Sequence, residues 1–132
     1  MNDKPTKPKM ILAIDDEPYM RDILKTVLEA EGYIVHTAGN GREGIELYKE
    51  RWRDIQVVLL DFMMPEMTGD QVFDQLKQIN PAAPILLVSG SADRLGQTAM
   101  LAKGIRGIIH KPFHLDELIR QVADVAGPAR VG

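Results

Sequence analysis

Short apolar runs alternate with stretches of helical spacing, and this alternation limits the possible folds more than any other feature of the sequence. The apolar runs lie at residues 10–14, 33–38, 57–60, 85–88 and 106–110. Between them apolar residues recur every three or four positions, which indicates amphipathic helices; one such set is Met20, Ile23, Leu24, Val27 and Leu28. Strands that alternate with helices predict βαβ units, and therefore an α/β fold in which helices cover both faces of a parallel sheet.

The runs differ in one respect that predicts their place in the sheet. Strands buried on both faces are continuously apolar, and four of the five runs fit that description. The run at 33–38 contains His36 and Thr37, so we expect it at an edge. The helical stretch at about 93–103 has the weakest pattern, because it contains Gly96 and several alanines.

Composition is typical of one globular domain and excludes several classes of function. The chain has 132 residues, of which 45% are hydrophobic and 27% charged, as in an ordinary single domain. No apolar stretch reaches membrane-spanning length, and a net charge of -3 provides no basic face for nucleic acid. The absence of cysteine excludes thiolate chemistry and fits a cytoplasmic location. We expect a domain at 10–126 between tails at 1–9 and 127–132.

Polar side chains follow four of the five predicted strands. Ligands of open parallel sheets bind beyond the carboxyl ends of the strands, so side chains at these positions should converge. The residues concerned are Asp15 and Asp16, Asp61, Ser89 and Lys111. The predicted edge strand contributes none.

This set of side chains suits magnesium and phosphoryl chemistry. Mg²⁺ prefers one or two carboxylates and retains several waters, and it would relieve the repulsion among Asp15, Asp16 and Asp61. Lys111 and Ser89 suit phosphoryl oxygens. A carboxylate beside Mg²⁺ and a lysine can accept a phosphoryl group covalently.

Each of these residues also has a purely structural explanation. Asp15 and Asp16 precede Pro18 and could cap a helix. Asp61 could be a turn residue, Ser89 a loop residue and Lys111 a solvated surface lysine. The three histidines lack metal-site spacing and are interpreted as structural. These explanations weaken jointly, because all the positions were selected by strand ends and their chemistry agrees.

At this point the chain resembles the response regulator receiver domains of two-component signalling, which are CheY-like. The resemblance rests on an ordered set of motifs and extends from about Met10 to Val125: IDDE at 14–17, LLDFMMPEMTG at 59–69, VSGSA at 88–92 and HKPF at 110–113. It implies a flavodoxin-like (βα)5 fold with strand order 2-1-3-4-5. It also implies a regulatory domain rather than an enzyme.

The resemblance assigns a role to each site residue. Asp61 would accept a phosphoryl group from a histidine kinase or histidine phosphotransfer domain. Asp16, Asp61 and the Met63 carbonyl would bind Mg²⁺ directly, and Asp15 would bind it through water. Lys111 would pair with the phosphoryl group, and Ser89 would move toward it. The Lys111–Pro112 peptide would be cis, and Gly69 would let the loop after Asp61 turn into the next helix.

Two positions affect how a signal could leave the site. Many receivers have an aromatic residue three positions before the lysine that moves with the hydroxyl residue, but here that position is Ile108, which is stiff. We still expect phosphorylation to change the surface around 93–103, 106–110 and 115–125. This surface would act on a downstream protein or kinase. The apolar side chain of Met63 cannot orient an attacking water.

A phosphodonor must cover the carboxyl-end rim, where apolar residues flank the acidic site. We expect it to dock on Tyr19, Met20, Pro112 and Phe113. Met20 and Phe113 could instead close the core, whereas Tyr19 lies off the core stripe.

Two other functions fit the sequence less well than this one. A haloacid-dehalogenase-like phosphatase needs an acid two residues after its aspartate, where Met63 stands here. A flavin module needs a phosphate-binding loop, and the acidic DDEPYM segment would repel a phosphate.

Overall fold

The computed structural model describes residues 8–90 and 94–129. Residues 1–7 and 130–132 of the expected tails, the last two residues of the VSGSA motif and residue 93 lie outside the described residues. Within the described part, strands and helices alternate strictly: β1 Met10–Ile14, α1 Pro18–Glu31, β2 Ile34–Ala38, α2 Gly41–Arg51, β3 Ile55–Asp61, α3 Gly69–Ile79, β4 Ile85–Gly90, α4 Arg94–Lys103, β5 Gly107–Lys111 and α5 Leu115–Ala126. None of these helices is long and apolar enough to cross a membrane.

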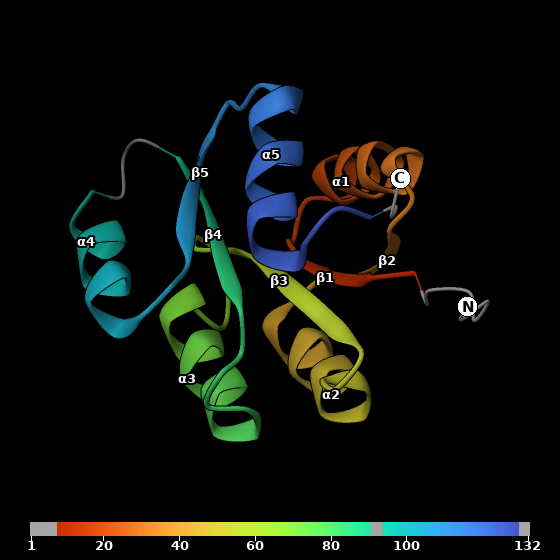
Figure 1. Cartoon of the computed structure of the whole chain (residues 1–132). Helices are drawn as coiled ribbons and strands as arrows, with labels where there is room; N and C mark the ends of the chain where they lie inside the picture. The colour runs from red at the N-terminus through yellow and green to blue at the C-terminus, as the bar shows by residue number, and fades with distance from the viewer. Residues whose placement is uncertain (1–7, 91–93, 130–132) are drawn as a thin grey trace.

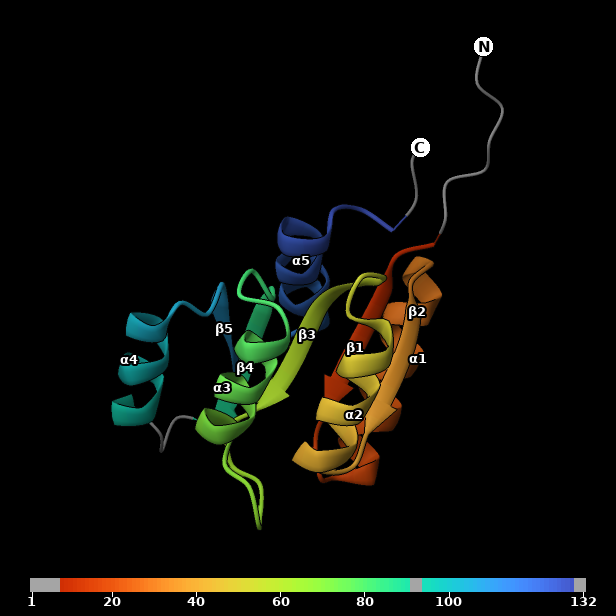
Figure 2. The same ribbon diagram turned by 90° about the horizontal axis from the view of Figure 1, so that it is seen from below.

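The strands form one parallel sheet in the order β2-β1-β3-β4-β5. The predicted α/β class, strand order and edge position of β2 are therefore confirmed. Helices α1 and α5 cover one face of the sheet, and α2 and α3 cover the other, with α4 beside them near β5 (Figures 1 and 2). Strands β3, β4 and β5 run further than expected, so Asp61, Ser89 and Lys111 lie within the strand ends rather than just beyond them.

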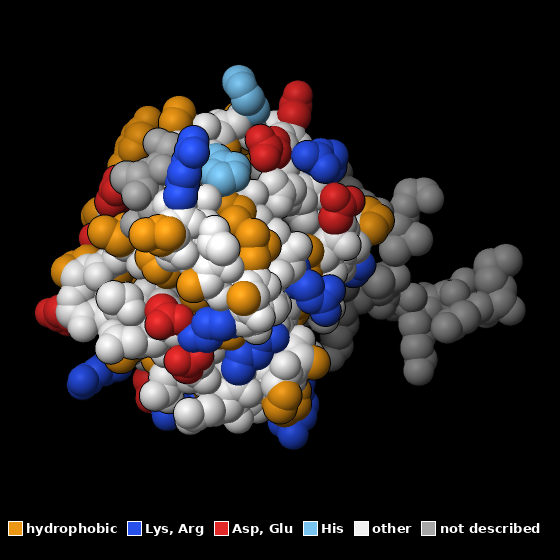
Figure 3. Space-filling view, turned by 90° about the vertical axis from the view of Figure 1, so that its left-hand side faces the viewer, with side chains coloured by type: hydrophobic (Ala, Val, Ile, Leu, Met, Phe, Trp, Pro, Cys, Tyr) orange, Lys and Arg blue, Asp and Glu red, His pale blue; other side chains and the backbone are white. Residues whose placement is uncertain are grey.

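Helix α4 exposes two large apolar side chains. Its Leu95 and Leu101 side chains are 89% and 53% exposed, and hydrophobic side chains gather on the face that carries this helix (Figure 3). At its C-terminal end Lys103 forms ion pairs with Asp70 and Asp74 of α3. The helix is thus tied to its neighbour by charge while its apolar surface faces solvent.

Side chains alternate along each central strand between two separate cores. In β1, Leu12 and Ile14 face the core that α2 and α3 cover, whereas Ile11 and Ala13 face the core under α1 and α5. The alternation follows from the two-residue period of a strand. It explains the continuous apolar runs, because both faces of these strands are buried.

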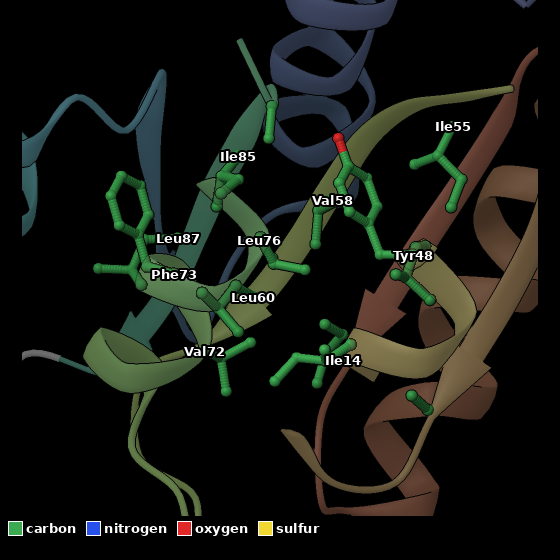
Figure 4. Close-up of a cluster of buried hydrophobic side chains, with 14 of the residues drawn as sticks. Ile14, Tyr48, Ile55, Val58, Leu60, Val72, Phe73, Leu76, Ile85 and Leu87 are labelled. Carbon is green, nitrogen blue, oxygen red and sulfur yellow. The ribbon is translucent and has the colours of Figure 1, made fainter. Parts of the chain in front are cut away.

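The core on the α2 and α3 side also contains one tyrosine (Figure 4). Tyr48 is fully buried, and its hydroxyl accepts a hydrogen bond of 3.1 Å from the Asn80 side chain. Asn80 follows the last residue of α3. The bond therefore satisfies a buried hydroxyl, as such groups require, and joins α2 to the end of α3.

The loop between β3 and α3 places a glycine against the backbone of the strand end. The positive φ in this loop belongs to Glu66, at 68°, and not to Gly69. A Cβ at Gly69 would lie 2.8 Å from the Phe62 Cα and 3.0 Å from the Asp61 carbonyl oxygen. Gly69 therefore lets the loop turn into α3, as expected, and it does so by permitting close approach of the backbone rather than by adopting a positive φ.

We predict that Gly69→Ala lowers the free energy of unfolding by about 1–3 kcal/mol, because backbone atoms must shift to admit the methyl group. Gly90→Ala is the matched control, since a Cβ there meets no atom within 4 Å. Urea unfolding of both variants measures the difference. Equal stability of the two variants would contradict the close-approach explanation.

Candidate functional site

Three charged side chains at the carboxyl edge of the sheet point to the same face. The strand residues two positions before them all belong to the core under α1 and α5, and alternation directs the next side chains to that face as well. These pairs are Ala13 and Asp15, Leu59 and Asp61, and Ile109 and Lys111. The two-residue period therefore explains why these charges meet.

The structure brings the predicted acidic residues together with the lysine. Lys111 Nζ lies 3.3 Å from Asp15 Oδ2 and 3.5 Å from Asp61 Oδ1. One carboxylate oxygen from each of Asp15, Asp16 and Asp61 lies within 4.8 Å of the others. Asp15 and Asp61 are only 1% and 4% exposed, whereas Asp16 is half-buried.

The carboxylates differ in how many of their oxygens are already occupied. Asp15 Oδ1 accepts a hydrogen bond of 2.9 Å from the Glu17 N–H, and its Oδ2 accepts one from Lys111. Asp61 Oδ1 accepts hydrogen bonds from the Met63 N–H and from Lys111. Within residues 8–90 and 94–129, the Asp16 carboxylate accepts none. Asp16 thus has the most free capacity for a ligand.

Opposing effects act on the pKa of Asp61. Burial, followed by repulsion from Asp15, raises the pKa of Asp61 to about 7, although Lys111 and the Met63 N–H oppose the rise. Burial lowers the pKa of Lys111, but attraction to Asp61 and Asp15 outweighs that effect, so this pKa is raised. A single lysine therefore does not neutralise the site, which favours binding of a further cation.

Capping does not explain the acidic pair. Helix α1 begins at Pro18, and its N-cap residue is Glu17, whose side chain makes no capping hydrogen bond. Asp15 binds the Glu17 N–H, which precedes the helix. Proline occupies the first turn as predicted, but the aspartates are not caps.

In the part of the chain that the structure describes, the side chains of Ser89 of β4 and Ile108 of β5 make no hydrogen bond to the three carboxylates: the hydroxyl of Ser89 bonds elsewhere, and Ile108 packs against a core. Ser89 is buried, and its hydroxyl donates a weak hydrogen bond of 3.4 Å to the Gly90 carbonyl. Ile108 is half-buried against the core on the α2 and α3 side. Among the described residues, the Ser89 hydroxyl thus has no hydrogen bond to the carboxylates or the lysine of the site, and Ile108 packs against the core on the other face from Leu59 and Ile109.

The residues assigned to docking fall into two groups. Tyr19 is 74% exposed, and Pro112 is also exposed and follows a cis peptide bond. Met20 and Phe113 are half-buried and pack against the core under α1 and α5, as the core-closing alternative predicts. Tyr19 also borders a groove of about 500 Å³ with Ile23, Val27 and Leu115.

The sequence did not reveal two residues whose side chains donate hydrogen bonds to backbone carbonyl groups near the site. Arg21 Nη1 donates a hydrogen bond of 2.8 Å to the Asp15 carbonyl. Gln97 of α4 is buried, and its side-chain amide donates one of 3.0 Å to the Gly90 carbonyl. A carbonyl partner leaves no mark in the sequence pattern, so neither contact had a signal that could reveal it.

A contact between Phe62 and Gly96 connects α4 to the residue after Asp61. A Cβ at Gly96 would lie 2.5 Å from the Phe62 ring atoms Cε2 and Cζ. The Phe62 ring also packs against the core on the α2 and α3 side. Helix α4 therefore contacts the ends of both β3 and β4.

The chain is similar to known proteins over most of its length. Residues 11–123 match the model of the response regulator receiver domain. The chemotaxis protein CheY of Thermotoga maritima is 35% identical over 123 residues, covering 89% of this chain and 98% of CheY. The probable transcriptional regulatory protein TcrX of Mycobacterium tuberculosis is 33% identical over 113 residues, covering 86% of this chain. The chain spans only 47% of the length of TcrX.

A solved structure supports the same relationship. In the crystal structure of the CheX–CheY–BeF3–Mg²⁺ complex from Borrelia burgdorferi, a chain superposes with a TM-score of 0.83 at 27% identity. The match covers 89% of each of the two chains. Together with the family model, these similarities show that the chain belongs to the response regulator receiver domains of two-component systems.

Proposed function

We propose that the chain is a phosphoacceptor that takes its phosphoryl group from a histidine kinase or a histidine phosphotransfer domain. The observation that carries the proposal is the buried Asp61 carboxylate, which lies beside Lys111 and within 4.8 Å of Asp15 and Asp16 oxygens. A carboxylate oxygen of Asp61 would attack phosphorus, and the phosphorus–nitrogen bond to the donor histidine would break. The domain would promote only its own phosphorylation and dephosphorylation.

The residues at the site fit Mg²⁺, which would neutralise developing charge on the phosphoryl oxygens when bound. Asp16 and Asp61 would be direct ligands together with the Met63 carbonyl, and Asp15 would act through water. The occupied oxygens of Asp15 support this division, because both already accept hydrogen bonds. The Borrelia burgdorferi complex with Mg²⁺ supports the same cofactor.

Lys111 and Ser89 would hold the transferred group. The ammonium of Lys111 lies between Asp15 and Asp61 and would pair with a phosphoryl oxygen. Within the described residues, the Ser89 hydroxyl makes one weak hydrogen bond, to the Gly90 carbonyl, and it would exchange that bond for a phosphoryl oxygen at little cost.

The surface around α4, β5 and α5 would transmit the phosphorylated state to a downstream protein or kinase. Ile108 has no hydroxyl with which to exchange partners. Helix α4 nevertheless contacts the residue after Asp61 through Gly96, and the residue after Ser89 through Gln97. These contacts support a route to the exposed apolar surface of α4 that does not need an aromatic residue at 108.

We expect Asp61→Asn to fold but to gain no phosphoryl mass when it is incubated with acetyl phosphate and Mg²⁺. Asparagine lacks the anionic oxygen that attacks phosphorus. Intact-protein mass spectrometry measures the result, with Asp54→Asn, an exposed acid, as the control that remains phosphorylated. Labelling of Asp61→Asn would show that another residue is the acceptor.

The same variant has a second, metal-free readout in its stability. Because the folded pKa of Asp61 is raised from 3.8 to about 7, the protonated carboxyl stabilises the fold, and this contribution is lost as the pH rises through that value. Asp61→Asn avoids the loss. In EDTA it should therefore melt above the wild type at about pH 8, and the gap should narrow toward about pH 5. A lower melting temperature at both pH values would favour a structural role for Asp61.

Removal of Asp16 should abolish Mg²⁺ binding, whereas removal of Asp15 should only weaken it. A direct ligand loses its bond to the metal, but a residue that acts through water leaves the metal's own ligands in place. Isothermal titration of Asp16→Asn and Asp15→Asn with Mg²⁺ distinguishes the two roles. Equal losses in the two variants would contradict the proposed division.

Tyr19→Ala should slow phosphotransfer from the cognate kinase without slowing labelling by acetyl phosphate. Truncation of an apolar residue at the centre of an interface costs about 1–3 kcal/mol, while a small donor needs no docking surface. Leu101→Ala is the control, because this exposed residue lies on α4, away from the groove beside Tyr19. If both phosphodonors were slowed equally, Tyr19 would not be a docking residue.

A further inference from the structure

Arg21 extends from α1 to the loop that carries the acidic pair. Its Nη1 donates a hydrogen bond of 2.8 Å to the carbonyl oxygen of Asp15, the residue directly after β1. The Asp15 N–H is also bound, since it donates to the Ala38 carbonyl at 3.0 Å. The sheet therefore holds the N–H of Asp15, and Arg21 holds its carbonyl.

The guanidinium of Arg21 also lies close to Gly39. A Cβ at Gly39 would lie 3.2 Å from Nη1 and 3.4 Å from Cζ of Arg21, so the guanidinium lies close against the glycine backbone. In the described part of the chain, no carboxylate lies within ion-pair distance of Arg21. Its hydrogen bond to a backbone carbonyl is thus its specific contact at the site.

We propose that Arg21 is a positioning residue for the metal site. The Asp15 carbonyl belongs to the peptide unit that joins Asp15 to Asp16, and this unit is planar. By fixing that plane, Arg21 would fix the direction in which Asp16 leaves the backbone and so hold its carboxylate beside Asp61. The proposal rests on the proposed Mg²⁺-dependent function and names a residue on which metal affinity depends.

The direction of the change in Mg²⁺ affinity distinguishes a positioning role from a simple electrostatic effect. Removal of a positive charge near three carboxylates should strengthen their attraction for a divalent cation. Loss of the carbonyl contact should instead let the Asp15–Asp16 peptide reorient and should weaken binding. The two effects act in opposite directions, so the direction of the change identifies the dominant one.

Lys25 offers a matched control on the same helix. Its Nζ donates a hydrogen bond of 3.4 Å to the backbone carbonyl of Val35 in β2, and it carries the same charge as Arg21. Lys25→Met therefore removes a cation and a carbonyl contact from α1 without affecting the acidic loop.

The test is Mg²⁺ titration of the full chain by calorimetry, with the melting temperature in EDTA as a second readout. Arg21→Met should raise the dissociation constant about tenfold, as loss of a residue that orients a ligand does, while Lys25→Met should leave it unchanged or lower it. Arg21→Lys, which keeps the charge but has no planar fork to lie against Gly39, should also bind Mg²⁺ more weakly than wild type. Lys25→Met also removes the exposed ion pair with Glu29, so the melting temperatures in EDTA report any loss of stability in each variant separately from its metal affinity.

Three results would overturn the inference. If Arg21→Met bound Mg²⁺ as tightly as wild type or more tightly, or if Lys25→Met lost as much affinity, Arg21 would have no positioning role and the proposed function would stand. If the wild-type chain bound no Mg²⁺, the proposed function would itself be wrong, and the inference with it.

Discussion

Two buried carboxylates share one lysine at the carboxyl edge of the sheet, and this unequal balance of charge determines the character of the site. Asp15 and Asp61 both contact Lys111, yet the pKa of Asp61 remains raised because burial and mutual repulsion exceed the attraction. Such an arrangement persists only if the fold holds the charges in place. The two cores do so, since both faces of the central strands are fully packed and their ends cannot separate.

Much of this arrangement could be predicted from the sequence. The apolar runs located the strands, and polar residues at their ends identified the acidic residues, Ser89 and Lys111. The prediction of the strand order had a different basis, because periodicity assigns residues to faces but does not show which strands are neighbours. That order came from the resemblance to receiver domains, and the structure confirms it.

Other features could not be predicted, for identifiable physical reasons. Arg21 and Gln97 bind backbone carbonyl groups, and every residue has a carbonyl, so the sequence does not reveal which one is used. The role of Gly69 in the turn was expected, but the close approach that requires it was not visible in the sequence, because it depends on the path of the loop. Met20 and Phe113 lie at the boundary between core and rim, where the sequence left both alternatives open and packing favours the core.

The contact between Phe62 and Gly96 has a consequence for how this protein can vary in evolution. Since a side chain at 96 would collide with the ring at 62, Gly96 is not free to change while Phe62 is present. A lineage that replaces the glycine should first, or at the same time, acquire a smaller residue at the position after Asp61. Among descendants of this chain the two positions should therefore covary, although they lie 34 positions apart in the sequence.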